Sequence, residues 1–397
     1  MVVITKQIER LNRITWYSLS LFFRLLTQVH KGRVLFWSTE FKTYGDNPKY
    51  ISEYILRNSM NMFDVYWGFK RNVSIPQDAK DANIVRFYTL RYLYIVNTAE
   101  FLITNHRTDD KTILWKKRRG QKYIMTWHGS MPLKKIENDA IDSLGDDYNQ
   151  FAIRDSNNCD LMLSDNKWFT QTIKRAFWYN GEILETGIPR NDIFFDNEEM
   201  ANVCNKVFTY YSIPAEYKIL LYAPTFRSNN DISHYLLRFK EIKEILEEKF
   251  NGKFIVLYRL HPNLLQIVDS TSFLLDIDAI NASTYPDIQE LLCASDVLIT
   301  DYSSVMCEYA LIKKPCFLYT EDLDIYNRGT YLNLKNVPYI LAKDVKELID
   351  GINKCDIDKY VIEINNFVET HFQPVSNLNA RKDVVSWMLS HSNSSYA

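Results

Sequence analysis

The feature that most constrains the fold is a repeating order of segments: a short apolar run, a polar turn and a helical stretch. Several runs carry Val, Ile, Leu and aromatic residues without polar alternation, as strands buried on both faces do. Alternating strands and helices predict parallel sheets with helices on both faces. The expected strands are 34–38, 64–67, 83–87, 101–104, 123–126, 161–164 and 183–186, then 219–223, 254–258, 297–300 and 316–319. The clearest expected helix is 233–250.

A break in this series divides the chain. The pattern restarts at Lys218, after a polar helix-like stretch at 197–211 and the segment Ser212-Ile213-Pro214. Because 397 residues suffice for two cores, we expect domains at 1–200 and 201–397, with the last helix crossing back to the first domain. Two doubly wound, Rossmann-like α/β domains usually bind ligands in a central cleft that the carboxyl ends of both sets of strands face.

Charge and cysteine content exclude several classes of protein. A net charge of -2 gives no overall attraction to nucleic acid. The six cysteines are scattered without a Cys-x-x-Cys pair, which indicates reduced thiols in a cytoplasmic protein. The sequence contains no Gly-x-Gly-x-x-Gly, Walker or His-Glu-x-x-His motif and no evident metal cluster. We therefore expect no cofactor and no metal.

The N-terminal region is apolar but carries no secretory signal. Residues 14–26 are too few for a membrane span, and Arg13 and Arg24 interrupt the apolar run. One interpretation is a helix packed on the core. The other is a helix at 6–26 that lies on the membrane surface, which its aromatic residues and the cations Lys6, Arg10, Arg13 and Arg24 favour.

His128 follows the expected strand 123–126, in the segment Thr126-Trp127-His128-Gly129-Ser130. A residue just past a strand's carboxyl end points into the crevice of a doubly wound fold. Gly129 lets the main chain approach a ligand closely, and an imidazole can accept a proton from a hydroxyl near neutral pH. The histidine alone favours a hydrogen-bonded core residue, whereas the other motifs together indicate a base.

Two cationic motifs follow strands of the second half. In Pro224-Thr225-Phe226-Arg227 a buried-type strand runs into a hydroxyl and a guanidinium, although Arg227 alone fits a surface ion pair. Arg259 and His261 alternate along an extended segment that Pro262 keeps out of helix, so they share one face. A cation beside an imidazole suits a phosphate better than an apolar core.

The fourth motif is the segment that runs from Asp301 to Ala310. Ser303 and Ser304 open a helix after the strand 297–300, and main-chain N–H groups at a helix start bind anions. Glu308 lies one turn after Ser304 and could accept hydrogen bonds from sugar hydroxyls. An ordinary serine N-cap explains one serine but not the run. The four motifs together suit a diphosphate and a hydroxyl nucleophile, held without a metal.

Five quoted stretches carry a family resemblance, and two further segments, YGDNPKYISEY and DLDIYNRGTYL, accompany them. TWHGSMPLKKI, GIPRND, YAPTFR, RLHP and LLCASDVLITDYSSVMCEYA resemble the signature set of the CDP-glycerol glycerophosphotransferases, which include primases and polymerases of wall teichoic acid and related capsule polymers. The resemblance spans roughly residues 34–385, in order. It implies a GT-B fold, a CDP-polyol donor on the C-terminal domain, and a lipid-linked saccharide or growing polymer on the N-terminal domain.

The resemblance also implies roles for individual residues. It places the catalytic histidines on His128 and His261, with transfer of the polyol phosphate to an acceptor hydroxyl and release of CMP. The residues expected to bind substrate are Gly129, Ser130, Arg190, Pro224, Thr225, Arg227, Arg259, Ser303, Ser304 and Glu308. Of these, the resemblance implies donor contacts for Arg190, Pro224, Thr225, Arg259, Ser303 and Ser304 and places the family's helix acid on Glu308. The enzyme would work in the cytoplasm, peripherally on the inner face of the cell membrane.

The sequence departs from the family pattern in three places, and the first two leave the donor polyol open. Met131 lengthens the His-Gly loop by one residue, Glu308 stands where the family commonly has Asp, and the glycine usual before Asn379 is missing. Glycerol is the expected polyol, with ribitol as another possibility. Two other functions remain: a GT-B glycosyltransferase that uses a nucleotide sugar, and a non-catalytic nucleotide-binding module on the membrane.

Overall fold

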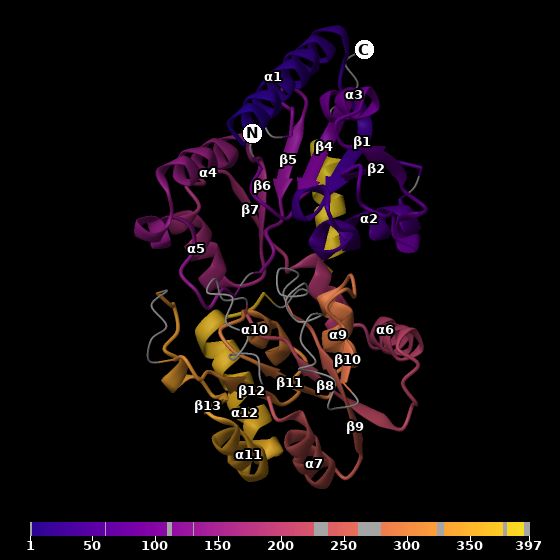
Figure 1. Cartoon of the computed structure of the whole chain (residues 1–397). Coiled ribbons are helices and arrows are strands. Elements are labelled where there is room, and N and C mark those ends of the chain that lie inside the picture. The colour runs from indigo at the N-terminus through magenta and orange to yellow at the C-terminus, as the bar shows by residue number, and fades with distance from the viewer. Residues whose placement is uncertain are drawn as a thin grey trace. The chain divides into compact units, whose positions relative to one another are not determined.

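The computed structural model describes residues 2–59, 61–108, 113–129, 131–225, 237–260, 279–323, 329–375 and 379–392, with the main chain alone for 2–13 and 335. The chain forms two compact units (Figure 1). The first comprises residues 1–130, 136–192 and 375–397, and the second comprises 131–135 and 193–374. The described residues contain no helix that combines the length and the hydrophobicity of a transmembrane span.

The first unit contains a seven-stranded sheet in the order β3-β2-β1-β4-β5-β6-β7, with every described pairing parallel. This is the strand order of a Rossmann-type fold, extended by one strand. The carboxyl-terminal end of each strand is within two residues of the end of the predicted strand. The strands are β1 (His30–Trp37), β2 (Asp64–Phe69), β3 (Asn83–Arg86), β4 (Ala99–Thr104), β5 (Lys122–Met125), β6 (Leu161–Ser164) and β7 (Glu182–Glu185).

Alternate residues of the first sheet pack against helices on opposite faces. In β1, Leu35 and Trp37 belong to one buried cluster, with residues of α3 and α5 and partly buried residues of α1. Val34 and Phe36 belong to the other cluster, with residues of α2 and α13. The sheet is therefore doubly wound. The helices are α1 (Val2–Leu26), α2 (Asp46–Asn58), α3 (Leu90–Thr98), α4 (Asp146–Asn158), α5 (Lys167–Ala176) and α13 (Ala380–His391).

The last helix, α13, is fixed to the first unit by several specific bonds. The Arg381 guanidinium donates to the Pro189 carbonyl at 3.0 Å, and the Trp387 indole donates to Glu182 at 2.8 Å. Val384 and Met388 are fully buried against this unit's core. The end of the chain thus completes a unit that its beginning starts.

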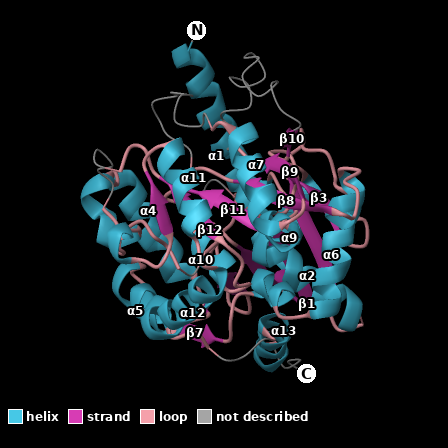
Figure 2. Ribbon diagram, turned by 90° about the horizontal axis from the view of Figure 1, so that it is seen from below, coloured by secondary structure: helices cyan, strands magenta, loops and turns pink. Residues whose placement is uncertain are grey.

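The second unit repeats the same topology with six parallel strands in the order β10-β9-β8-β11-β12-β13. Figure 2 shows α7 and α9 beside β8 and β9 of this sheet. The strands are β8 (Tyr217–Tyr222), β9 (Lys253–Tyr258), β10 (Ala279–Asn281), β11 (Val297–Thr300), β12 (Cys316–Tyr319) and β13 (Ile340–Ala342). The helices are α6 (Asn197–Tyr210), α7 (Phe239–Phe250), α9 (Ile288–Ala294), α10 (Val305–Ala310), α11 (Val345–Lys354) and α12 (Ile357–Phe367).

One predicted helix start is wrong. The helix expected at 233–250 begins at Phe239, and Leu237 and Arg238 before it are not helical. Its predicted end is confirmed, because Asn251 takes the left-handed conformation with φ 46° and ψ 57°. A left-handed residue just past the last turn is a common way for a helix to end.

The N-terminal helix α1 shows features of both sequence interpretations. Trp16, Tyr17, Leu19 and Phe23 pack against the first unit's core, and the Ser20 hydroxyl donates to the Leu114 carbonyl at 2.5 Å. The side chains that are left exposed include the large apolar residues Ile14, Phe22, Leu25 and Leu26. One face of the helix is therefore core-packed while another presents apolar groups to solvent.

Candidate active site

The strand order fixes where each unit can bind a ligand. In a doubly wound sheet the crevice lies outside the carboxyl ends of the strands where the winding changes direction, which in the first unit is between β1 and β4. Asn105 and His106 follow β4, Trp127 and His128 follow the adjacent β5, and Asp46 begins α2 after β1. Five polar or aromatic side chains thus gather at one edge of this sheet.

His128 is exposed to solvent and is not packed in the core. Its Nδ1 atom lies 3.0 Å from the main-chain carbonyl oxygen of Asn105. A carbonyl only accepts hydrogen bonds, so Nδ1 carries the proton of the neutral ring. Nε2 then holds the lone pair, and no described residue is bonded to it. This tautomer presents a basic nitrogen to solvent.

Two aromatic rings lie close to the His128 imidazole. The His106 ring is stacked on it with centroids 4.5 Å apart, and the Trp127 ring is 4.3 Å away. Burial and then the adjacent His106 imidazole lower the pKa of His128, since two neighbouring rings resist carrying charge together. Solvent access to the side chain limits the size of this shift. The direction favours a neutral ring that is ready to accept a proton.

Arg190 lies in the same part of the first unit as His128. It belongs to the 3-10 helix Pro189–Phe194, and its guanidinium donates to the main-chain carbonyl of His128 at 2.7 Å. It also forms an ion pair with Asp46 at 3.0 Å. Its predicted contact with the donor stays a prediction. Gly129, also predicted as a substrate contact, is buried directly after His128.

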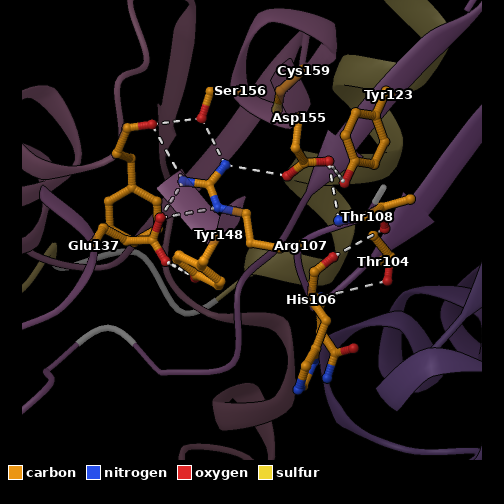
Figure 3. A network of polar contacts seen from close by, with 12 residues as sticks. Thr104, His106, Arg107, Thr108, Tyr123, Glu137, Tyr148, Asp155, Ser156 and Cys159 are labelled. Carbon is orange, nitrogen blue, oxygen red and sulfur yellow. Dashed lines mark hydrogen bonds and ion pairs between the residues drawn. The ribbon is translucent and has the colours of Figure 1, made fainter. Parts of the chain in front are cut away.

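A buried ionic network lies directly behind this site (Figure 3). Arg107 donates to Glu137 at 2.8 Å and to Asp155 at 3.1 Å, and it also bonds the Ser156 hydroxyl. Figure 3 shows that the His106 ring points away from this network. Because Arg107 also packs near Trp127, with its guanidinium 5.9 Å from the ring centroid, the network supports the loop that carries His128.

The candidate residues of the second unit lie at its own change of winding, between β8 and β11. Pro224 and Thr225 follow β8, and Asp301 follows β11. The Thr225 hydroxyl donates to the buried Asp301 carboxylate at 2.6 Å, and its main-chain N–H donates at 2.9 Å. Asp301 therefore holds the Pro224-Thr225 loop at the carboxyl edge of the sheet.

Arg259 follows β9 at the same edge. Its guanidinium donates to the carbonyls of Tyr285, at 2.5 Å, and Ala282, at 3.3 Å. No carboxylate within the described ranges forms an ion pair with it. Burial lowers its pKa, but a guanidinium stays charged in proteins. A partly buried cation that forms no ion pair with a described carboxylate, although the charge of Asp287 acts on it, is suited to an anionic ligand.

The serine-led helix differs from its prediction in two ways. The helix α10 spans only six residues, so its dipole is weaker than expected. Ser304 makes no side-chain cap, while the Ser303 hydroxyl accepts from the Val305 N–H at 3.4 Å. Glu308 is buried and accepts from Gln289 at 2.5 Å. That bond engages one of the oxygens that were expected to meet a sugar hydroxyl.

Three predicted site residues lie outside the described residues: His261, Ser130 and Arg227. The sequence interpretation missed Asp46, Asn105 and His106. Asp46 lies inside the family-like segment YGDNPKYISEY, and Asn105 and His106 directly follow the predicted strand 101–104. Applying the rule that polar residues after strand ends face the crevice to every strand would have found Asn105 and His106.

Two Rossmann-type parallel sheets in one chain, each with polar residues at its change of winding, define a GT-B-like protein. Residues 19–390 match the family described as CDP-glycerol:poly(glycerophosphate) glycerophosphotransferase. The chain belongs to this family. The predicted family and GT-B-like fold are thereby confirmed.

Relatives and a solved structure agree with this assignment. The chain is 32% identical to a teichoic acid poly(glycerol phosphate) polymerase of Staphylococcus epidermidis, over 79% of this chain and 45% of that protein. It is 30% identical to a teichoic acid glycerol-phosphate transferase of Staphylococcus aureus, over 87% of this chain and 90% of that protein. The chain thus spans less than half of the longer polymerase.

The structural match is to the wall teichoic acid polymerase TagF, in a histidine-to-asparagine variant soaked with CDPG. The TM-score is 0.82 at 27% identity, and the match covers 98% of this chain and 95% of the other.

Proposed function

We propose that this protein transfers glycerol phosphate from CDP-glycerol to a hydroxyl of a lipid-linked saccharide or growing teichoic-acid-type polymer, and releases CMP. The observation that carries the proposal is the solvent-exposed His128, whose Nδ1 faces the Asn105 carbonyl and whose Nε2 has no bonded partner among the described residues, in a chain of the glycerophosphotransferase family. The names of the relatives favour glycerol phosphate as the transferred unit.

His128 acts as the general base in this proposal. The acceptor hydroxyl attacks the phosphorus that bears glycerol, and its proton passes to Nε2 of His128. A new O–P bond forms as the bond between that phosphorus and the CMP oxygen breaks. Base catalysis of this kind contributes about 10² to 10⁴ in rate.

The second unit binds the donor in this proposal. Arg259 lies at the carboxyl edge of the sheet and forms no ion pair with a carboxylate of the described residues, and Thr225 is held at the same edge by Asp301. Arg259, Pro224, Thr225, Ser303, Ser304 and Glu308 remain the proposed donor contacts, together with His261 and Arg227 from the sequence pattern. Fixed cations and donors stabilise the charge that develops on departing CMP.

The first unit binds the acceptor, and Gly129 and Ser130 are further proposed substrate contacts. Arg190 remains a proposed contact with the donor. The helix α1 of the first unit also attaches the enzyme peripherally to the inner face of the cytoplasmic membrane. The exposed Leu25 and Leu26 lie beside the basic segment 116–119, because Arg118 of that segment donates to the carbonyls of Arg24 and Thr27, each at 2.7 Å. Apolar groups next to cations favour an anionic lipid surface.

Activity is tested with the purified full chain, a lipid-linked disaccharide acceptor, and CDP-glycerol, CDP-ribitol or a UDP-sugar. We expect CMP release and a product heavier by glycerol phosphate units with CDP-glycerol. His128→Ala should reduce the rate about 10² to 10⁴-fold while CDP-glycerol still binds. The matched control is His30→Ala, at the opposite end of β1. Near wild-type transfer by His128→Ala excludes the proposed base, and UDP release excludes the proposed donor.

Membrane attachment is tested by flotation with vesicles of phosphatidylglycerol and phosphatidylethanolamine, against vesicles of phosphatidylcholine. Leu25→Glu combined with Leu26→Glu should weaken binding at least about tenfold, since each apolar side chain contributes more than about 1 kcal/mol when buried. Ile362→Glu changes a similarly exposed apolar residue of the second unit and serves as the control. If the double variant floats with the vesicles as well as the wild type does, the proposed membrane contact through α1 is excluded.

A further inference from the structure

A closed ring of polar contacts joins the main chain and the side chain of His128. The His128 carbonyl accepts from Arg190 at 2.7 Å, and Arg190 pairs with Asp46 at 3.0 Å. The other Asp46 oxygen accepts from the Asn105 side chain at 2.7 Å. The Asn105 carbonyl returns to Nδ1 of His128 at 3.0 Å. Both ends of the histidine are thus held through one carboxylate.

A neighbouring residue strengthens the main-chain side of this ring. Asn47 donates from its amide to the Trp127 carbonyl at 3.0 Å and accepts from the Arg190 N–H at 3.0 Å. Asp46 in turn accepts from the Asn47 N–H at 2.7 Å. The peptide units on both sides of His128 are therefore bonded to residues that Asp46 orients.

Backbone geometry indicates that these contacts hold a demanding conformation. Asp46 has φ 60° and Trp127 has φ 55°, both in the left-handed region that residues with a side chain rarely adopt. Such conformations persist where the surroundings over-determine them, and they cluster at functional sites. The two strained residues are therefore Asp46, whose carboxylate joins both halves of the ring of contacts, and Trp127, which immediately precedes His128.

We propose that Asp46 is a positioning residue for His128, which acts through Arg190 and Asn105 to fix the ring orientation and the tautomer that leaves Nε2 unprotonated. This inference rests on the proposed role of His128 as the base. Asp46 itself touches neither substrate nor the reacting atoms in this proposal. The groups that face His128 in the described part of the first unit are His106, Asp46, Arg190 and the Asn105 carbonyl.

The decisive variant is Asp46→Asn in the full chain. Asparagine keeps the shape and one acceptor oxygen, but it removes the charge that Arg190 pairs with. Because small losses of alignment cost large factors in rate, we expect kcat to fall about 10 to 100-fold, with KM for CDP-glycerol within about twofold. Asp139→Asn breaks the exposed ion pair with Arg175 in the same unit and should leave kcat unchanged.

A double variant separates positioning from an independent effect. If Asp46 works through His128, adding Asp46→Asn to His128→Ala should reduce the residual activity less than about twofold. Additive losses would overturn the proposal. If Asp46→Asn does not fold, Asn105→Ala keeps the main-chain acceptor but releases it from Asp46. That variant should lower kcat about tenfold, and a wild-type kcat would also overturn the proposal.

The tautomer provides a readout that does not depend on activity. In protein labelled with ¹⁵N-histidine, the His128 signals are those absent from His128→Ala, and we expect Nδ1 to carry the proton. Asp46→Asn should mix the two tautomers. An unchanged tautomer in Asp46→Asn refutes the positioning role of Asp46. If Asp46→Asn instead shows mixed tautomers while His128→Ala keeps full activity, only the proposed role of His128 as the base is refuted.

Discussion

Replacing Arg107 by methionine should destabilise the first unit strongly. The guanidinium bonds Glu137 and Asp155, which are 3% and 2% exposed, and also the Ser156 hydroxyl and the Phe177 carbonyl. Methionine is similar in length but supplies no donor. Arg107→Met therefore leaves two buried carboxylates without their cation.

The expected loss follows from the burial of both partners. Removing one member of a buried ion pair costs about 3–5 kcal/mol, because the remaining charge keeps its desolvation penalty. For a unit of this size, about 1 kcal/mol shifts the melting temperature by roughly 2–4 °C. We expect the melting temperature to fall by roughly 6–20 °C.

The loss should depend on pH in a defined direction. Burial raises the pKa of Asp155 from 3.8 to about 6, and Arg107 opposes that rise. A raised carboxyl pKa stabilises the fold at low pH, and this contribution is lost as pH rises through the folded pKa. In Arg107→Met the pKa of Asp155 rises further. The variant should therefore lose less stability at about pH 5 than at about pH 7.5.

Urea unfolding followed by circular dichroism at both pH values measures these free energies. Arg175→Met is the matched control, because Arg175 pairs with Asp139 at 2.6 Å but its side chain is 51% exposed. Exposed pairs contribute about 0–1 kcal/mol. The reasoning is refuted if Arg107→Met loses less than about 1 kcal/mol near neutral pH, or the same amount at both pH values.

Three further predictions concern single sites. Thr225→Val removes the hydroxyl that donates a hydrogen bond to the Asp301 carboxylate. KM for the donor, measured by CMP release, should therefore rise about 5 to 30-fold while the fold stays intact. Gly32→Ala should destabilise the protein by more than about 1 kcal/mol, since φ is 73° and a Cβ would lie 2.5 Å from a main-chain oxygen; thermal unfolding tests this. Burial and the His106 ring lower the pKa of His128, and His106→Phe removes the second cause. The acid limb of the kcat/KM profile should then move to higher pH, and an unmoved limb would contradict the coupling.

The strands could be predicted from the sequence because their composition reflects burial on two faces. All eleven predicted runs are strands, with ends that differ by a few residues. Within the described ranges, the strands that the sequence did not predict are β10 and β13, which have three residues each, and β10 is only partly buried. Runs that short carry no periodic signal. The helix α7 was overextended because apolar spacing continues through Leu237, which is buried outside the helix.

Only part of the candidate site could be predicted from the sequence. His128 was found because a histidine between tryptophan and glycine at a strand end is distinctive. Asp46, 82 residues before it, is chemically unremarkable at the start of a helix. Its contact with Arg190 arises only when the sheet brings the ends of β1, β4 and β5 together. Partners that are distant in sequence leave no local pattern.

The return of α13 to the first unit has a consequence for biosynthesis. The ribosome delivers about 180 residues of the second unit between Asp192 and the helix that covers the first sheet. Throughout that interval the apolar surface around Ile51 and Ile55 lacks the side chains of Val384 and Met388. The first unit is therefore synthesised first but can be completed only when α13 has been translated. Until then the nascent polypeptide must be kept from aggregating.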